Sequence, residues 1–131
     1  MDEYKFPEDL RYSEEHEWVR IAEGLAVVGI TDYAQHKLGD VTYVELPAIG
    51  ADLEPMGEMC VVESVKAAAD VFAPVGGTVA ETNAALDDQP QIINQDCYGQ
   101  GWLVKIKGFA QEDLDKLMDA AAYRDFVAKE A

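Results

Sequence analysis

Turn-forming residues divide most of this chain into short apolar segments, and that spacing limits the possible folds more than any other feature. Glycines such as Gly24 and the Gly76-Gly77 pair separate successive segments. Short apolar runs bounded by turn signals are typical of an all-β core, so we expect a mainly β protein. The strands that we predict are residues 17–21, 25–30, 41–46, 59–64, 67–72, 78–83 and 102–107.

Two segments depart from the strand pattern and have helical signals. Thr31 and Asp32 can start a helix of about two turns, and Gly39 supplies its end. Beyond Gly108, acidic residues precede and basic residues follow a set of apolar positions, which complements the helix dipole. That set is Leu114, Leu117, Met118, Ala121, Ala122 and Phe126. We expect a short helix after the second strand and a C-terminal helix, interrupted near Asp119, that packs on the sheet.

The last predicted strand has the clearest period of two. Its alternating sets are Trp102, Val104 and Ile106, and Leu103, Lys105 and Lys107. Such alternation predicts a strand with a well-buried face. We therefore expect Trp102 to fill the core, and we expect residues 87–90 to form a polar loop ahead of this strand.

The length fits one ordinary domain of 131 residues. We expect a single domain over residues 1–131, with a β core at about 11–107 and a C-terminal helical segment at about 111–129. No apolar run approaches the roughly 20 residues that span a bilayer, and the first residues lack the features of a secretory signal. These features predict a cytoplasmic protein without membrane contact, or a mitochondrial matrix protein if the chain is a processed eukaryotic form.

The formal net charge is −16, from 26 acidic and 10 basic residues. A phosphate backbone would be repelled, so nucleic acid is not an expected partner. The two cysteines and two histidines lack metal-ligand spacing, and we expect no metal site. Cys60 lies in an apolar run and is expected to be a buried, reduced thiol.

Common catalytic signatures are missing from the chain. We find no GxSxG elbow, no Walker-type phosphate loop and no HExxH motif. The many acids leave open a carboxylate pair without a motif. The expectation is a non-catalytic protein.

Lys66 stands between two predicted strands, near the tip of a hairpin. An amine at such a tip projects into solvent, and the small residues Ala67, Ala68 and Ala69 leave room for an enzyme that would acylate it. Lysines also occupy hairpin tips as ordinary solvated charges. Position alone therefore leaves both interpretations open.

The segment Glu63-Ser64-Val65-Lys66-Ala67 resembles the lipoylation motif of the glycine cleavage H-protein family. A lipoyl domain of a 2-oxoacid dehydrogenase would share this motif but is shorter, and biotin carriers usually have methionines beside the lysine. Further blocks that resemble the family are residues 13–20, 28–35, 38–41, 44–47, 73–77, 94–96 and 98–103. Cys97, Gly76 and Ala69 depart from the residues that are frequent at their positions in the family.

The resemblance implies both a fold and a function. The fold would be a flattened barrel-sandwich of the lipoyl/biotinyl-carrier type, with lipoate attached to Lys66 through an amide. Lipoyl-attaching enzymes would modify the lysine. The swinging arm would carry an aminomethyl group from the pyridoxal-phosphate glycine decarboxylase to the tetrahydrofolate-dependent aminomethyltransferase, linking glycine catabolism to one-carbon metabolism. Dihydrolipoamide dehydrogenase would then reoxidise it.

By the same resemblance, the loaded arm folds back into a cleft of the carrier. This nominates Glu17 and Asp70 as cleft residues, with Lys37 as a third candidate. A carboxylate there would favour an ammonium group on the arm. An H-like lipoyl carrier in lipoyl relay or sulfur oxidation is the main alternative, and an interaction module with unmodified Lys66 is another.

Overall fold

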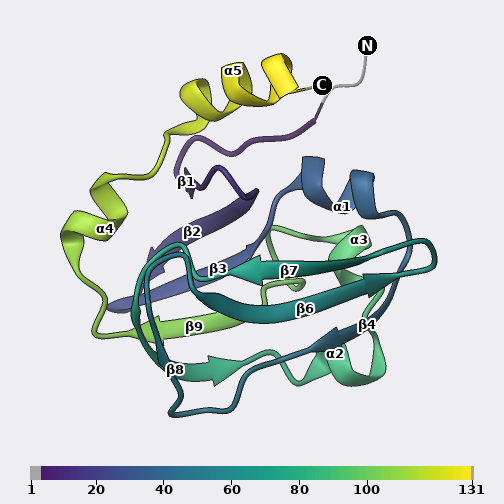
Figure 1. The fold of residues 1–131 in the computed structure, drawn as a ribbon, viewed down its shortest axis with the longest axis horizontal. Helices are drawn as coiled ribbons and strands as arrows, with labels where there is room; N and C mark the ends of the chain where they lie inside the picture. The colour runs from purple at the N-terminus through teal and green to yellow at the C-terminus, as the bar shows by residue number, and fades with distance from the viewer. Residues whose placement is uncertain (1–3, 131) are drawn as a thin grey trace.

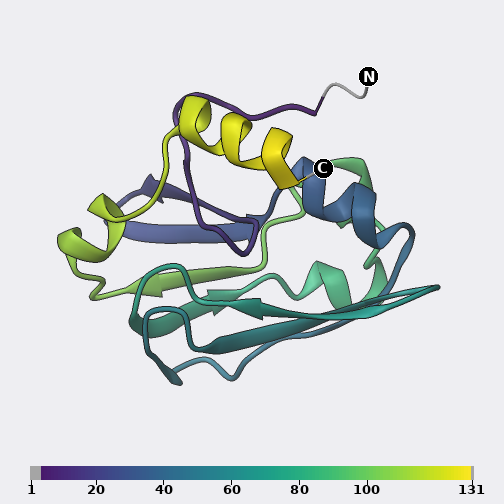
Figure 2. The same ribbon diagram turned by 45° about the horizontal axis from the view of Figure 1, so that its top comes forward.

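Two antiparallel sheets form the body of the molecule, for which a computed structural model describes residues 4–130. One sheet has the order β1-β2-β3-β9-β8-β5 and the other β4-β6-β7. The strands of the larger sheet are Arg11–Tyr12 (β1), Glu17–Ala22 (β2), Leu25–Ile30 (β3), Val104–Lys107 (β9), Gly77–Thr82 (β8) and Asp52–Leu53 (β5). Those of the smaller sheet are Val41–Glu45 (β4), Glu58–Ser64 (β6) and Ala68–Phe72 (β7). Figures 1 and 2 show the sheets as facing layers.

The mainly β fold predicted from the sequence is confirmed, with one refinement. The flattened barrel-sandwich consists of two separate sheets and is not a closed barrel. The two-residue strands β1 and β5 were not predicted from the sequence, because they are too short to show alternation.

Alternation along β3 divides the core into two clusters. Val28 and Ile30 enter the cluster between the sheets, whereas Val27 enters an aromatic cluster on the opposite face. Trp18 is the largest fully buried side chain of that aromatic cluster, and its indole N–H donates to the Cys97 carbonyl at 3.0 Å. Both faces of β3 are therefore covered, which explains its almost continuous apolar sequence.

The helices are Asp32–Leu38 (α1), Ala85–Asp88 (α2), Ile92–Gln95 (α3), Gln111–Asp115 (α4) and Ala120–Glu130 (α5). The predicted start and end of α1 are confirmed, because the Thr31 hydroxyl accepts from the Ala34 N–H at 3.2 Å and Gly39 ends the helix at φ 80°. The predicted polar loop at residues 87–90 is wrong in its first half, since α2 extends through Asp88. Cys60 is buried, as predicted.

The C-terminal segment forms two helices, and the apolar face predicted for it is wrong over α5. Ala120, Tyr123 and Val127 are the buried residues, while Ala121 and Ala122 are exposed. Between the helices, Met118 exchanges two backbone hydrogen bonds of 2.8 Å with Tyr12. After this bridge, α5 packs on the aromatic cluster. Figure 2 shows the helix on the side of the larger sheet that faces away from the smaller sheet.

Trp102 is also not where the alternation placed it. It precedes β9 and is half-buried, while Leu103 and Val104 are both fully buried. The Asn83 amide donates to the carbonyls of Gln100 at 2.7 Å and Trp102 at 2.8 Å, which holds this stretch as a loop. The predicted period of two therefore holds over β9, where Val104 and Ile106 are buried, and is wrong only at Trp102 and Leu103.

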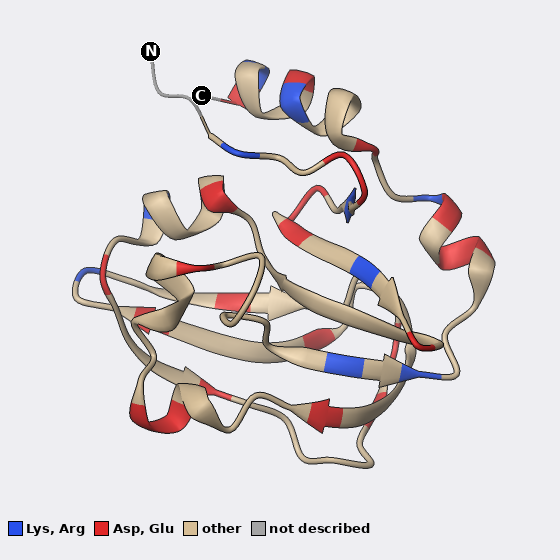
Figure 3. Cartoon of the chain, turned by 180° about the vertical axis from the view of Figure 1, so that it is seen from behind, with Lys and Arg blue, Asp and Glu red and all other residues tan. Residues whose placement is uncertain are grey.

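Figure 3 shows acidic positions on strands, helices and loops of both layers, with few basic positions between them. Within residues 4–130, no group of three or more His, Cys, Asp or Glu side chains has an arrangement that could hold a metal ion. None of the helices described is long and apolar enough to cross a membrane.

Candidate functional site: a lysine hairpin beside a cleft

Lys66 is the second of the three residues that join β6 to β7. The hairpin projects beyond the rest of the molecule (Figures 1 and 2), and both Val65 and Lys66 are exposed. Ser64 closes the turn, because its N–H donates to the Ala67 carbonyl at 2.7 Å and its hydroxyl accepts from the Ala67 N–H at 3.1 Å. A short closed turn fixes the point from which the Lys66 side chain starts.

The hairpin rests on the turn that follows α1. The Val65 N–H donates to the Asp40 carbonyl at 3.1 Å. The Asn94 side chain fixes that turn, since its amide group donates to the Gly39 carbonyl and its oxygen accepts from the Val41 N–H, both at 2.9 Å. A Cβ added to Gly39 would lie 3.5 Å from the Lys66 Cε, so the lysine side chain extends back toward the end of α1.

A cleft of about 280 Å³ lies between α1 and β7, next to this hairpin. Ala34 and Leu38 line it from α1, and Ala69 and Val71 line it from β7. All four side chains are apolar and the two alanines are small. The cleft can therefore accept an extended apolar chain that starts near the hairpin.

The three residues nominated as arm-cleft candidates, Glu17, Lys37 and Asp70, all line this one cleft. Lys37 is exposed and its Nζ lies 5.6 Å from the centre of the Tyr33 ring. Asp70 also borders a second pocket of about 220 Å³ on the outer face of the smaller sheet. Alternation with the buried Val71 points the Asp70 side chain toward that outer face. Of the three, Glu17 is the one with a buried carboxyl group.

Glu17 is 1% exposed, and its carboxyl group has two hydrogen-bond donors. The Phe72 N–H donates to its Oε2 at 3.0 Å, and the Ser13 hydroxyl donates to its Oε1. Burial raises the pKa of Glu17 to about 7, and the bonds from Ser13 and Phe72 oppose that rise. The group therefore changes its protonation state near neutral pH.

A comparison with family models decides the assignment that the sequence resemblance suggested. The model described as glycine cleavage H-protein matches residues 10–130. The chain belongs to the glycine cleavage H-protein family.

Individual H proteins are similar over nearly the whole chain. A glycine cleavage system H protein of Marinobacter nauticus is 52% identical over 127 residues, which cover 96% of this chain and 98% of the relative. One from Bacteroides fragilis is 46% identical over 122 residues, covering 93% and 97%. The crystal structure of a glycine cleavage system H protein from Mycobacterium marinum has a TM-score of 0.84 at 34% identity, covering 95% of this chain and 98% of that chain. Sequence and fold thus agree on the H-protein family.

Sequence reasoning missed three further residues of the cleft in this H-protein family member. His16, Tyr33 and Glu130 line it together with Glu17. Glu130 is 114 positions from His16, yet its Oε1 lies 2.8 Å from the His16 Nε2. No local pattern signals a contact over that separation. Ser13, which supports Glu17, lies in one of the blocks that resemble the H-protein family.

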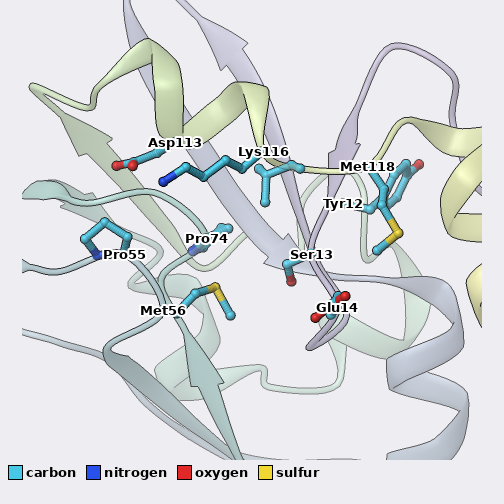
Figure 4. A pocket seen from close by; sticks show the side chains of 10 residues that line it. Tyr12, Ser13, Glu14, Pro55, Met56, Pro74, Asp113, Lys116 and Met118 are labelled. Atoms are coloured by element: carbon cyan, nitrogen blue, oxygen red, sulfur yellow. The ribbon is translucent and has the colours of Figure 1, made fainter.

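A separate pocket of about 390 Å³ lies on the other side of Ser13 and is lined by none of the predicted site residues (Figure 4). Its walls include Tyr12, Met56 and Met118, so it is largely apolar. Ser13 lines this pocket, whereas its partner Glu17 lines the cleft. The Ser13–Glu17 pair therefore separates this pocket from the cleft. The lysine hairpin lies beside the cleft and does not line the pocket.

Proposed function

We propose that this chain is the lipoyl carrier of a glycine cleavage system, and that lipoate is attached to Lys66 through an amide. The observation that carries the proposal is an exposed lysine, held at a hairpin tip beside a cleft, in a member of the H-protein family. When bound, lipoate would supply a disulfide that takes up an aminomethyl group and becomes a dithiol once the group is released, which dihydrolipoamide dehydrogenase would reoxidise. The chain itself is a carrier rather than a catalyst.

The residues around Lys66 suit the attachment of such an arm. Ala67 and Ala68 add no bulk beside the amine, which leaves access for an acylating enzyme. A lysine extended by a lipoyl chain reaches roughly 14 Å, from bonds of about 1.5 Å in zigzag. Strand β7 runs for roughly 13 Å at about 3.3 Å per residue, so an arm of this length could follow the strand from the hairpin to its far end. The apolar lining also fits an aliphatic chain.

Other groups of the chain have distinct tasks in this proposal. Ser64 closes the turn that presents the Lys66 Nζ to partner enzymes. Ala34 and Leu38 exclude water from the middle of the cleft. Glu17 lies at the end of β7 that is remote from the hairpin, where an ionised carboxylate favours an ammonium group and a protonated one does not. Asp70 and Lys37 border the cleft and adjust the charge at its mouth.

The partners that we propose are glycine decarboxylase, aminomethyltransferase, dihydrolipoamide dehydrogenase and the lipoyl-attaching enzymes. A carrier must leave each partner after one step, so these interfaces should be small and transient. The net charge of −16 would speed encounters with basic partner surfaces. Such steering weakens as salt is added.

Mass spectrometry and a reconstituted reaction test the proposal together. The protein incubated with lipoate, ATP and a lipoyl-attaching enzyme should gain the mass of one lipoyl group, mapped to Lys66 by peptide fragmentation. With glycine decarboxylase, glycine should then drive loading of this arm. Absence of the mass gain, or its location on another lysine, would refute the attachment. A lipoylated chain that glycine cannot load would instead favour lipoyl relay or sulfur oxidation.

A further inference from the structure

Four side chains form a continuous hydrogen-bonded series from the start of α1 to the last turn of α5. The Thr31 Oγ1 lies 2.8 Å from the Tyr123 hydroxyl, which lies 2.7 Å from the His16 Nδ1. The His16 Nε2 lies 2.8 Å from the Glu130 Oε1. The Tyr33 hydroxyl also donates to that carboxylate oxygen at 3.4 Å. Residues far apart in the sequence thus meet at one rim of the cleft.

With a neutral histidine, one direction of donors and acceptors satisfies every group of this series. The Glu130 carboxylate can only accept, so the His16 Nε2 must carry a proton. In the neutral imidazole, Nδ1 then accepts from the Tyr123 hydroxyl. Tyr123 in turn accepts from Thr31, whose oxygen accepts from the Ala34 N–H. With a neutral His16, every group of the series therefore has a hydrogen-bond partner, and no second proton on the imidazole is required.

The series holds the end of α5 against the cleft. His16 and Glu130 both line the cleft, and Figure 2 shows the C-terminal end of α5 beside α1. The terminal turn of a helix has few internal hydrogen bonds and tends to fray. The Glu130 side chain is 41% exposed, so its contacts with His16 and Tyr33 add to the burial of Val127 in securing this turn.

We propose that His16 and Glu130 are positioning residues that hold the last turn of α5 as an outer wall of the cleft, and thereby set how often a group tethered to Lys66 leaves it. This inference rests on the proposed function, because it requires an arm on Lys66. The α5 helix would then serve the carrier cycle as well as covering the aromatic cluster. Opening of its last turn would release the arm to partners without disturbing the sheets.

The test measures exposure of the arm on the full-length lipoylated protein. A small phosphine reduces the dithiolane only when the ring is accessible, and alkylation followed by intact mass reports the extent. The variants are Glu130→Ala, which removes the acceptor, and His16→Asn, which suits the positive φ of 73° but cannot span both partners. Glu130→Gln keeps a carbonyl acceptor. Lys129→Gln, on an exposed position of α5, is the matched control.

We expect Glu130→Ala and His16→Asn to be reduced roughly five- to tenfold faster than the parent, as loss of a charge-assisted hydrogen bond implies. Glu130→Gln should restore most of the protection, and Lys129→Gln should match the parent. The melting temperature of Glu130→Ala should stay within a few degrees of the parent, since the change affects a helix end. If His16 and Glu130 had a purely structural role, the variants would change stability without changing the rate at which the arm is reduced.

Two results would overturn the inference. In the first, the arms of Glu130→Ala and His16→Asn are reduced as slowly as that of the parent, although hydrogen exchange shows that the last turn of α5 has loosened. The other is a parent protein reduced as fast as a short lipoylated peptide, because no wall would then protect the arm. Failure of the proposed function would appear earlier and separately, as a parent that gains no lipoyl group.

Discussion

The Glu17 carboxylate accepts a 3.0 Å hydrogen bond from the Phe72 backbone N–H, so a side chain of β2 satisfies a donor at the free edge of β7. No described strand pairs with this edge of β7. The contact joins the two sheets through one buried acid, while burial raises the pKa of that acid to about 7. The same group therefore links the architecture of the cleft to its response to pH.

The first prediction concerns Glu17→Gln and the pH dependence of stability. The unfolded chain releases the Glu17 proton near pH 4.5, whereas the folded chain retains it until about pH 7. The stability from this group is therefore complete below about pH 4.5 and is lost as the pH rises to about 7, by about 3 kcal/mol. Glutamine can keep both contacts without titrating, so the variant should gain stability relative to the parent between pH 5 and pH 8.

Urea unfolding of both proteins at about pH 5 and about pH 8 measures this difference. Glu14→Gln, at an exposed neighbouring position, should show the pH dependence of the parent. Identical pH dependence in Glu17→Gln and the parent would show that Glu17 is ionised throughout this range.

The second prediction is that Lys66→Arg abolishes lipoylation while the fold stays intact. Arginine keeps the charge but has no amine that can be acylated. The exposed side chain contributes little packing, so the free energy of unfolding should change by no more than about 0.5 kcal/mol. Intact mass after incubation with the lipoyl-attaching enzyme gives the result, and Lys37→Arg, on the opposite wall of the cleft, should be modified normally. A lipoyl group on Lys66→Arg would remove Lys66 from its proposed role.

The third prediction concerns the support of the hairpin by Asn94. Aspartate has the same shape but cannot donate to the carbonyl of Gly39 or the side chain of Gln35, which the Asn94 amide does at 2.9 Å in both cases. Asn94→Asp should cost about 2 kcal/mol in the free energy of unfolding. It should also speed hydrogen exchange at the Val65 amide, which bonds to the same turn.

Gln95→Glu makes the same change of charge at an exposed position of α3 and serves as the control for Asn94→Asp. If both variants lose equal stability, net charge and not the support of the turn would account for the effect.

The fourth prediction separates the two tryptophans. Trp18 is fully buried, so Trp18→Ala should cost about 3–5 kcal/mol. Trp102 is half-buried and lies under the Lys105 Nζ, 4.8 Å from the ring centre, so Trp102→Ala should cost about 1 kcal/mol. Denaturant unfolding of both variants measures the two losses in the free energy of unfolding. Equal losses would contradict the burial of Trp18 in the aromatic cluster.

The sequence was informative wherever structure depends on neighbours along the chain. Gly24 and Gly39 mark real turns, and the strands on either side of Lys66 could be predicted from short apolar runs. The resemblance to H proteins supplied the lysine and the three cleft candidates, which alternation alone could not have nominated. The confirmed turns and strands come from local backbone preferences, whereas the site candidates come from a family-wide pattern.

The errors arose where distant contacts override local pattern. The bridge between Tyr12 and Met118 shifts the buried face of α5, and the Asn83 side chain holds Trp102 outside its predicted strand. The contact of His16 with Glu130 likewise joins opposite ends of the sequence. A periodic pattern contains no information about such partners, because each is fixed only once the sheets have formed.

The free edge of β7 also bears on strand addition between two copies of the chain. Backbone direction alternates along a strand, so Ala68 and Asp70 turn their N–H and C=O groups to the same side as Phe72. An unpaired edge of this kind is a template on which a second copy can add a strand. Here α1 and the end of α5 stand across that side, and Glu17 occupies one of its donors. The cleft thus leaves room for a flexible side chain, while the elements across it block strand addition by another polypeptide backbone.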